Sequence, residues 1–138
     1  MSDDRLSDDY AAALGRAIHG FARLEWMAVR CCERLRPGAL DELSDRTAGR
    51  IADTLIHLLG RPDAPAVSEP VRKAARDFEF LVGTRNNLVH ARPGLAPDGT
   101  EALFRDGDQW TLDEFTRVTA TFAACEQVLA DALAGPLA

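Results

Sequence analysis

Apolar residues recur at helical spacing along most of this chain. Over residues 7–35 the apolar positions, three or four residues apart, are Leu14, Ala17, Ile18, Phe21, Leu24, Ala28, Cys32 and Leu35. This spacing lines one face of an α-helix. Ser7, followed by two aspartates, is typical of a helix N-cap, and Pro37-Gly38 marks a helix end. We therefore predict a first helix over residues 7–35.

The same spacing predicts two further helices. The second runs from about Leu40 to Leu59, ends at Gly60 and buries Leu43, Ile51, Leu55, Leu58 and Leu59. After a loop over residues 62–65, Ser68 caps the third helix, which ends near His90 because Pro93-Gly94 follows. The apolar stripe of this third helix comprises Val71, Ala74, Ala75, Phe78, Leu81, Val82, Leu88 and Val89.

Turn signals replace the helical pattern between Leu95 and Trp110. Two Gly-containing turns bracket residues 101–105, which predicts a short hairpin or an ordered loop. Thr111 and Glu114 then form a capping box for a fourth helix. Its apolar face carries Leu112, Phe115, Val118, Phe122, Cys125, Leu129 and Leu133. The pattern predicts an all-α protein, an antiparallel four-helix bundle in which residues 1–138 form a single domain.

Charge and hydropathy narrow the function classes. The chain has 138 residues, a net charge of −6 and no run of basic residues, which argues against a broad basic face that coats nucleic acid. A local cationic cleft stays compatible with this charge. No apolar run is long enough to cross a membrane, and the acidic start at Met1 is unlike a signal peptide. We expect a cytoplasmic protein.

The cysteines and histidines do not form a metal-binding pattern. Cys31, Cys32 and Cys125 are odd in number and include an adjacent pair, which is a poor disulfide framework and a poor zinc site. The three histidines are scattered. We predict small core cysteines, no metal and no cofactor.

Two charged residues fall inside apolar stripes. Glu25 lies within the stripe of the first helix, and Arg85 lies near the centre of the stripe of the third. Because a lone buried charge is costly, each needs a partner. One interpretation is a structural ion pair across the helix interface. The other is a cleft in which Glu25 orients Arg85 toward a ligand, and the two interpretations are compatible.

His90 lies on a different face of the third helix from Arg85. At about 100° per residue it shares a face with Asn86, more than a hundred degrees around the helix from Arg85. A histidine in the last turn of a helix commonly complements the helix dipole. Alone, it would not identify a catalytic site.

The segment Arg85-Asn86-x-x-x-His90, at the end of the third predicted helix, resembles the Arg-x4–6-His motif of HEPN ribonucleases. Asn87-Leu88-Val89, inside the segment, matches the commonest form of the motif. The stretch Phe21-Ala-Arg-Leu-Glu25-Trp26 also resembles first helices of that superfamily. The likeness covers most of the chain in architecture, whereas the specific match is the six-residue motif.

The HEPN resemblance implies a metal-independent endoribonuclease, often a toxin or phage-defence effector. It implies a homodimer in which the motifs of two subunits face one RNA, and an antitoxin or defence-system partner is compatible with it. His90 would exchange protons with the ribose 2′-hydroxyl or the departing 5′-oxygen, and Arg85 would stabilise phosphate charge. Asn86 would orient His90 or donate to the phosphate. Arg92 and Arg105 would add phosphate contacts, although solvated loop arginines are the simpler interpretation.

Two non-enzymatic alternatives stay open. The first is a non-catalytic HEPN-like module that binds a nucleotide or docks a protein, in which Arg85 binds phosphate or only pairs with Glu25. The second is a structural helical dimer, for which Trp26, Phe21 and the adjacent cysteines would provide apolar surface. The Gly-rich phosphate loop, the helical His-Glu-x-x-His motif and the nucleophile elbow are not found in the sequence.

Overall fold

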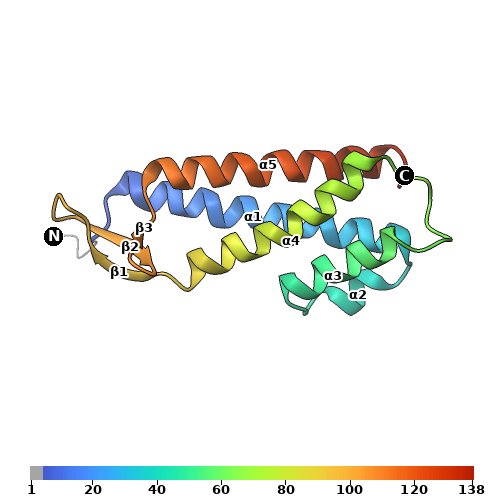
Figure 1. The fold of residues 1–138 in the computed structure, drawn as a ribbon, viewed down its shortest axis with the longest axis horizontal. Helices are drawn as coiled ribbons and strands as arrows, with labels where there is room; N and C mark the ends of the chain where they lie inside the picture. The colour runs from blue at the N-terminus through green and yellow to red at the C-terminus, as the bar shows by residue number, and fades with distance from the viewer. Residues whose placement is uncertain (1–4) are drawn as a thin grey trace.

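The computed structural model describes residues 5–138, which form a mainly helical protein with a small sheet at one end (Figure 1). The elements in chain order are α1 (Asp8–Leu35), α2 (Ala39–Leu43), α3 (Ala48–Leu59), α4 (Glu69–Val89), β1 (Arg92–Leu95), β2 (Glu101–Arg105), β3 (Asp108–Gln109) and α5 (Leu112–Ala134). Residues 1–4, on which the expectation of no signal peptide rested, lie outside the described residues. Within residues 5–138, no helix combines the length and apolarity that crossing a membrane requires.

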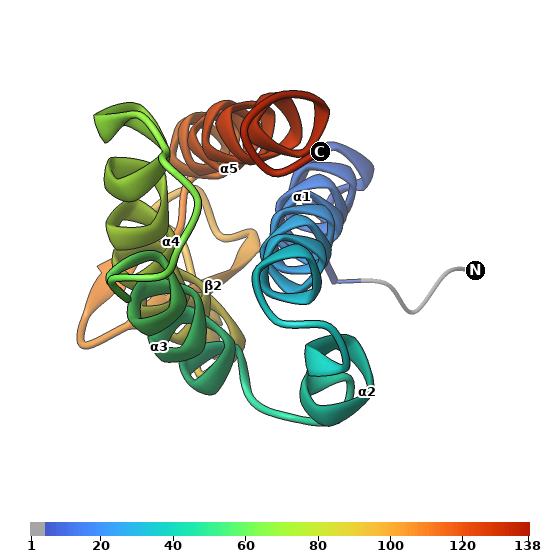
Figure 2. The same ribbon diagram turned by 90° about the vertical axis from the view of Figure 1, so that its right-hand side faces the viewer.

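The first and last helices pack along their lengths and run in the same direction. The pairs in contact are Tyr10 with Phe115, Phe21 with Phe122, and Cys31 with Leu129. The end-on view shows α4 beside α5 and α3 on the side between α4 and α1 (Figure 2). The mainly helical class is confirmed. The arrangement differs from a bundle in which each helix reverses the one before it, since such a bundle would make α1 and α5 antiparallel.

The prediction of one continuous helix over residues 40–59 is wrong, because polar residues divide it into α2 and α3. Ser44 Oγ donates a hydrogen bond of 3.2 Å to the carbonyl of Asp41. Thr47 then N-caps α3, its hydroxyl accepting a bond of 3.3 Å from the backbone N–H of Arg50. Short hydroxyl side chains of this kind compete with the helical backbone pattern.

Glu33 fixes the start of α2. Its carboxylate accepts hydrogen bonds from the backbone N–H of Gly38, at 3.0 and 2.9 Å, and of Leu40, at 3.0 Å. These bonds to the charged form lower the pKa of Glu33 below its ordinary value. Gly38 has a φ of 98°, the left-handed region that favours glycine.

Helices α2 and α3 leave part of α1 and part of α4 uncovered. Figure 1 shows α2 and α3 beside the second half of α1 only, while the last part of α4 continues past α3 toward the sheet. Val89, expected in the apolar stripe of α4, is 48% exposed, and Ile18 and Leu112 are exposed as well. These three members of the expected apolar stripes are therefore not buried.

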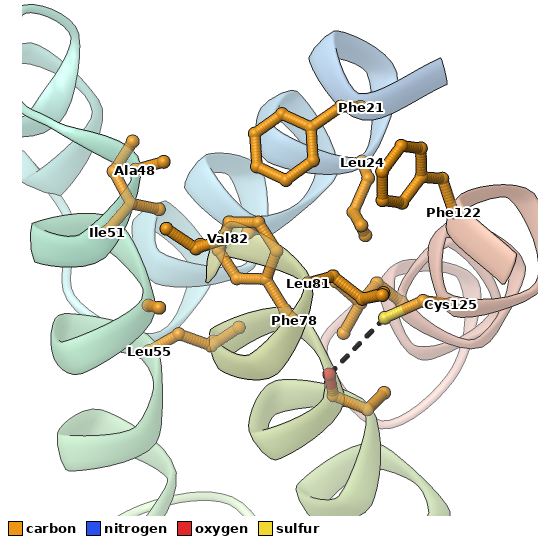
Figure 3. Packing of buried hydrophobic residues seen from close by; sticks show 14 of the residues in the cluster. Phe21, Leu24, Ala48, Ile51, Leu55, Phe78, Leu81, Val82, Phe122 and Cys125 are labelled. Carbon is orange, nitrogen blue, oxygen red and sulfur yellow. Dashed lines mark hydrogen bonds between the residues drawn. The ribbon is translucent and has the colours of Figure 1, made fainter. Parts of the chain in front are cut away.

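Side chains from α1, α3, α4 and α5 share one core. Figure 3 shows Phe21 and Leu24 from α1 near Phe122 of α5, with Phe78 between them and the α3 side chains. The three cysteines are free thiols within this core, and burial raises the pKa of each to about 12. The Cys125 thiol donates to the carbonyl of Ala74 at 3.3 Å. The prediction of core cysteines is confirmed.

A three-stranded antiparallel sheet joins α4 to α5. Its order is β1-β2-β3, and its register pairs Arg92 with Phe104. The sheet begins earlier than the predicted hairpin, because Pro93-Gly94 ends the helix and is itself part of β1. The expected hairpin is therefore confirmed but extended, and its first strand starts two residues after His90.

Candidate functional site

His90 is the C-cap residue of α4. Its backbone N–H donates to the carbonyl of Asn86 at 3.0 Å, and its backbone leaves the helical region, with φ −99° and ψ 6°. Its side chain is exposed. The chain turns into β1 within two residues, so the imidazole is held at a helix end by backbone structure on both sides. The predicted end of the third helix is confirmed.

Arg85 lies at the interface of α4 with α1, where it packs on an aromatic ring. Its Cζ atom is 4.8 Å from the centroid of the Phe21 ring, a cation–π geometry worth about 0.5–2 kcal/mol. The side chain is half-buried. Its Nε atom is buried without a hydrogen-bond partner in the described protein. A buried donor in this state costs free energy until an acceptor reaches it.

Glu25 lies near Arg85 without a direct ion pair. The carboxylate is half-buried, and burial raises its pKa, while the positive charge of Arg85 opposes that rise. Within residues 5–138, no oxygen of Glu25 approaches a nitrogen of Arg85 to 4.0 Å. Phe21 and Glu25 are one turn apart on the same face of α1, so Arg85 faces both and contacts the ring.

The sheet brings Arg105 to the motif. Arg105 Nη1 donates a long hydrogen bond of 3.5 Å to the carbonyl of His90, and its Nε lies 3.9 Å from the carboxylate of Asp106. A cation at the carbonyl end of a helix complements the helix dipole. Arg92 is exposed at the start of β1 and has no carboxylate within 4.0 Å in the described part of the chain. Of the two candidate loop arginines, Arg105 is thus the one that contacts His90.

The side chains of the motif have different surroundings in one chain. Arg85 is turned toward Phe21, whereas Asn86 and His90 are exposed. The hydrogen bond between Asn86 and His90 joins their backbones, and none joins their side chains among the described residues. The expected orientation of His90 by the Asn86 amide is therefore not formed in this structure. Proton transfer at a phosphate bound by Arg85 would require a histidine from a second chain, or a movement of His90 in the same chain.

A groove between α4 and α5 is a feature that the sequence analysis did not find. It has a volume of about 850 Å³. Thr84, Asn87 and Trp110 are among the residues that line it, and Phe80, another of them, is 77% exposed. The available signal was Phe80, an aromatic residue outside the predicted apolar stripe of its helix. Asn87 thus belongs to the groove, while Arg85 and His90 are not among the lining residues.

Among residues 5–138, no three His, Cys, Asp or Glu side chains gather closely enough to hold a metal ion. The candidate reactive side chains at the end of α4 are an arginine, an asparagine and a histidine. These groups bind anions, donate hydrogen bonds and transfer protons.

No family model, no curated protein and no solved structure matches this chain. The HEPN resemblance consequently rests on the residues themselves. These are the Arg85-to-His90 motif and its position at the end of a long helix in a mainly helical protein.

Proposed function

We propose that this protein is a metal-independent endoribonuclease of the HEPN type that acts as a homodimer. The observation that carries the proposal is the state of Arg85, a half-buried guanidinium held over Phe21 with a buried Nε that has no protein acceptor. A phosphate group is an acceptor whose geometry suits a guanidinium. His90, five residues later, is exposed and supplies a group for proton transfer.

The proposed reaction is an internal transesterification of RNA. His90 takes the proton of a ribose 2′-hydroxyl, whose oxygen forms a bond to the adjacent phosphorus while the bond from phosphorus to the 5′-oxygen breaks. The 5′-oxygen leaves with a proton from an imidazolium. Arg85 stabilises the charge that develops on the phosphate oxygens. The products are a 2′,3′-cyclic phosphate and a 5′-hydroxyl, and DNA is not cleaved because it lacks the nucleophile.

In the proposed dimer a second copy supplies a histidine to Arg85, because His90 of the same chain lies more than a hundred degrees around α4 from it. The part of α1 and α4 that α3 leaves uncovered bears the exposed apolar residues Ile18 and Val89. We propose that this surface is self-complementary about a two-fold axis, so that Arg85 of each copy lies near His90 of the other. Phe21, Cys31 and Cys32 are buried and contribute none of this surface.

The resemblance also supports a biological role as a toxin or phage-defence effector in the cytoplasm. In that role an antitoxin or a defence-system partner would restrain the nuclease. The proposed partners are therefore RNA, a second copy and such a protein, with no cofactor.

The proposal is tested by incubating total RNA with the protein in EDTA. Wild type is expected to cleave RNA and leave cyclic phosphate ends, whereas His90→Ala and Arg85→Met are expected to lose at least about a hundredfold in rate. His57→Ala, a substitution of an exposed histidine in α3, is the matched control and retains the rate. Absence of cleavage by pure dimeric wild type, or equal cleavage by all four proteins, would refute the proposal.

A non-catalytic docking module is the second candidate, and the groove between α4 and α5 favours it. The groove is lined by apolar and polar side chains in similar number, and the highly exposed Phe80 is one of them. An exposed aromatic in a groove is typical of a protein-binding surface. This candidate predicts partner binding that Phe80→Ser abolishes, together with no RNA cleavage.

A further inference from the structure

The solvent side of α1 carries a row of four arginines, with one histidine and one tryptophan between them. Six exposed side chains follow one another at intervals of three or four residues, which keeps them on one side of the helix. These residues, here named the α1 basic row, are Arg16, His19, Arg23, Trp26, Arg30 and Arg34. The distance from Arg16 to Arg34, 18 steps along the helix, is about 27 Å.

The α1 basic row contains no acidic residue. Between Asp9 and Leu35, helix α1 has two acids, and both are engaged elsewhere. Glu25 is half-buried near Arg85, and Glu33 caps the start of α2. In a protein of net charge −6, this side of α1 is therefore a local region of positive charge.

Most of these charges are not neutralised by neighbouring helices. Arg23 pairs with Glu126 of α5 at 2.9 Å. Within residues 5–138, no carboxylate lies within 4.0 Å of Arg16, Arg30 or Arg34. Arg46, Arg61 and Arg76, by contrast, each have an acidic partner. The unpaired arginines on α1 are available to an anionic ligand.

We infer that the α1 basic row binds the phosphate backbone of single-stranded RNA. Regularly spaced guanidinium groups along a helix suit a linear polyanion, because each can donate two bonds to one phosphate. Trp26, 48% exposed in the middle of the row, offers a face on which a base can stack. An acidic protein would use the charges but not this aromatic platform, so RNA is the favoured ligand.

The position of the row connects it to the motif. Trp26 follows Glu25 directly, and Glu25 lies near Arg85, so the row is on the side of α1 that faces away from the motif on α4. The separation is about one helix width, 10 Å. This inference rests on the proposed function, in that the RNA bound by the row is the substrate whose cleavage the motif performs.

Binding is measured by the anisotropy of a fluorescein-labelled oligouridine, with the full chain carrying His90→Ala so that the RNA stays intact. Arg16→Gln/Arg30→Gln/Arg34→Gln is expected to weaken binding at least about tenfold and to reduce the slope of log affinity against log salt by about 2. The matched control, Arg46→Gln/Arg50→Gln/Arg61→Gln, removes the same charge around α3 and is expected to change affinity less than about twofold. Equal weakening by both triple variants would overturn the inference.

Tryptophan fluorescence gives a second readout. The chain has two tryptophans, and Trp110 is buried, so quenching by unlabelled oligouridine reports on Trp26. Quenching is expected to saturate together with the anisotropy signal, and Trp26→Ala is expected to weaken binding while leaving the salt slope unchanged. Binding without quenching would place the RNA elsewhere and overturn the inference. If the protein binds poly-glutamate and not oligouridine, and the α1 triple variant loses that binding, the row would be assigned to an acidic protein.

Failure of this inference is distinguishable from failure of the proposed function. In the otherwise wild-type chain, which keeps His90, the α1 triple variant is expected to raise KM for RNA and leave kcat unchanged, because the row binds substrate away from the reacting atoms. If wild type cleaves RNA and the triple variant has the same KM, the row is not a binding site and the proposed function stands. If wild type binds RNA through the row without cleaving it, the proposed nuclease fails and the inferred site stands.

Discussion

The hydroxyl of Tyr10 donates a 2.7 Å hydrogen bond to the carbonyl of Trp110, which lies 100 residues later in the chain. The same hydroxyl accepts a bond of 2.9 Å from the backbone N–H of Leu103 in β2. Burial raises the pKa of Tyr10, so the hydroxyl stays protonated. One buried side chain of α1 thereby fixes both the sheet that carries Arg105 and the start of α5.

Removal of this hydroxyl is expected to destabilise the protein. Tyr10→Phe keeps the ring packing but leaves a backbone donor and a backbone acceptor unsatisfied, at a cost of about 1–3 kcal/mol. Urea unfolding measures the change. Thr121→Val, which deletes an exposed hydroxyl on α5, is the control and should alter the free energy of unfolding by less than about 0.5 kcal/mol. Equal effects would mean that the Tyr10 bonds contribute no net stability.

Arg85 is expected to matter for activity more than for stability. Arg85→Met preserves an unbranched side chain over Phe21 and removes the unpaired Nε, so the free energy of unfolding should change by less than about 1 kcal/mol. RNA cleavage should fall at least about a hundredfold. If the free energy of unfolding of this variant were several kcal/mol below that of wild type, the main role of Arg85 would be to stabilise the core.

Glu25 should make the protein less stable as pH rises. Its folded-state pKa is raised above the ordinary 4.5, so at intermediate pH the folded state binds more protons than the unfolded state. The free energy of unfolding therefore decreases with pH, beginning near 4.5 and ending above the folded pKa. Glu25→Gln should remove this decline and be more stable than wild type at neutral pH. Urea unfolding over a pH series tests it, and parallel curves for the two proteins would contradict it.

Substitution by alanine at two glycines, Gly94 and Gly83, should change the stability of the protein in opposite directions. A Cβ at Gly94 would lie 2.8 Å from Cδ1 of Phe104, so the ring must move and the sheet should lose about 1–3 kcal/mol. A Cβ at Gly83, in the middle of α4, meets nothing within 4 Å. Gly83→Ala should therefore stabilise the protein by about 0.5–1 kcal/mol through helix propensity. Thermal unfolding midpoints that shift in the same direction would contradict this account of the sheet.

The helix ends were the most predictable part of the fold, because they depend on nearby residues. Ser7 caps α1 by accepting from the N–H of Tyr10, and Thr111 caps α5 by accepting from the N–H of Glu114. Only half of the predicted capping box forms, since the Glu114 carboxylate pairs with Arg117 instead. Ser68 is the N-cap of α4 without a side-chain bond.

Features that depend on distant contacts were not predictable from the local pattern. Glu33 caps the start of α2 from another helix, so no local pattern indicated a separate short helix there. The break itself had only the weak local signals of Ser44 and Thr47. Likewise, the helical phase of Arg85 predicted that it faces α1. It could not decide between Glu25 and Phe21 as the group in contact, because the two share one face.

The parallel packing of α1 against α5 has a consequence for synthesis on the ribosome. The apolar face of α1 is made first, and its main partner emerges only after the α2-to-β3 segment has been translated. The core therefore cannot close co-translationally until α5 has left the exit tunnel, and the high sequence separation of this pairing slows folding. Under the proposed function, the helices that carry the cleavage site would not be packed on their main partner until α5 has emerged.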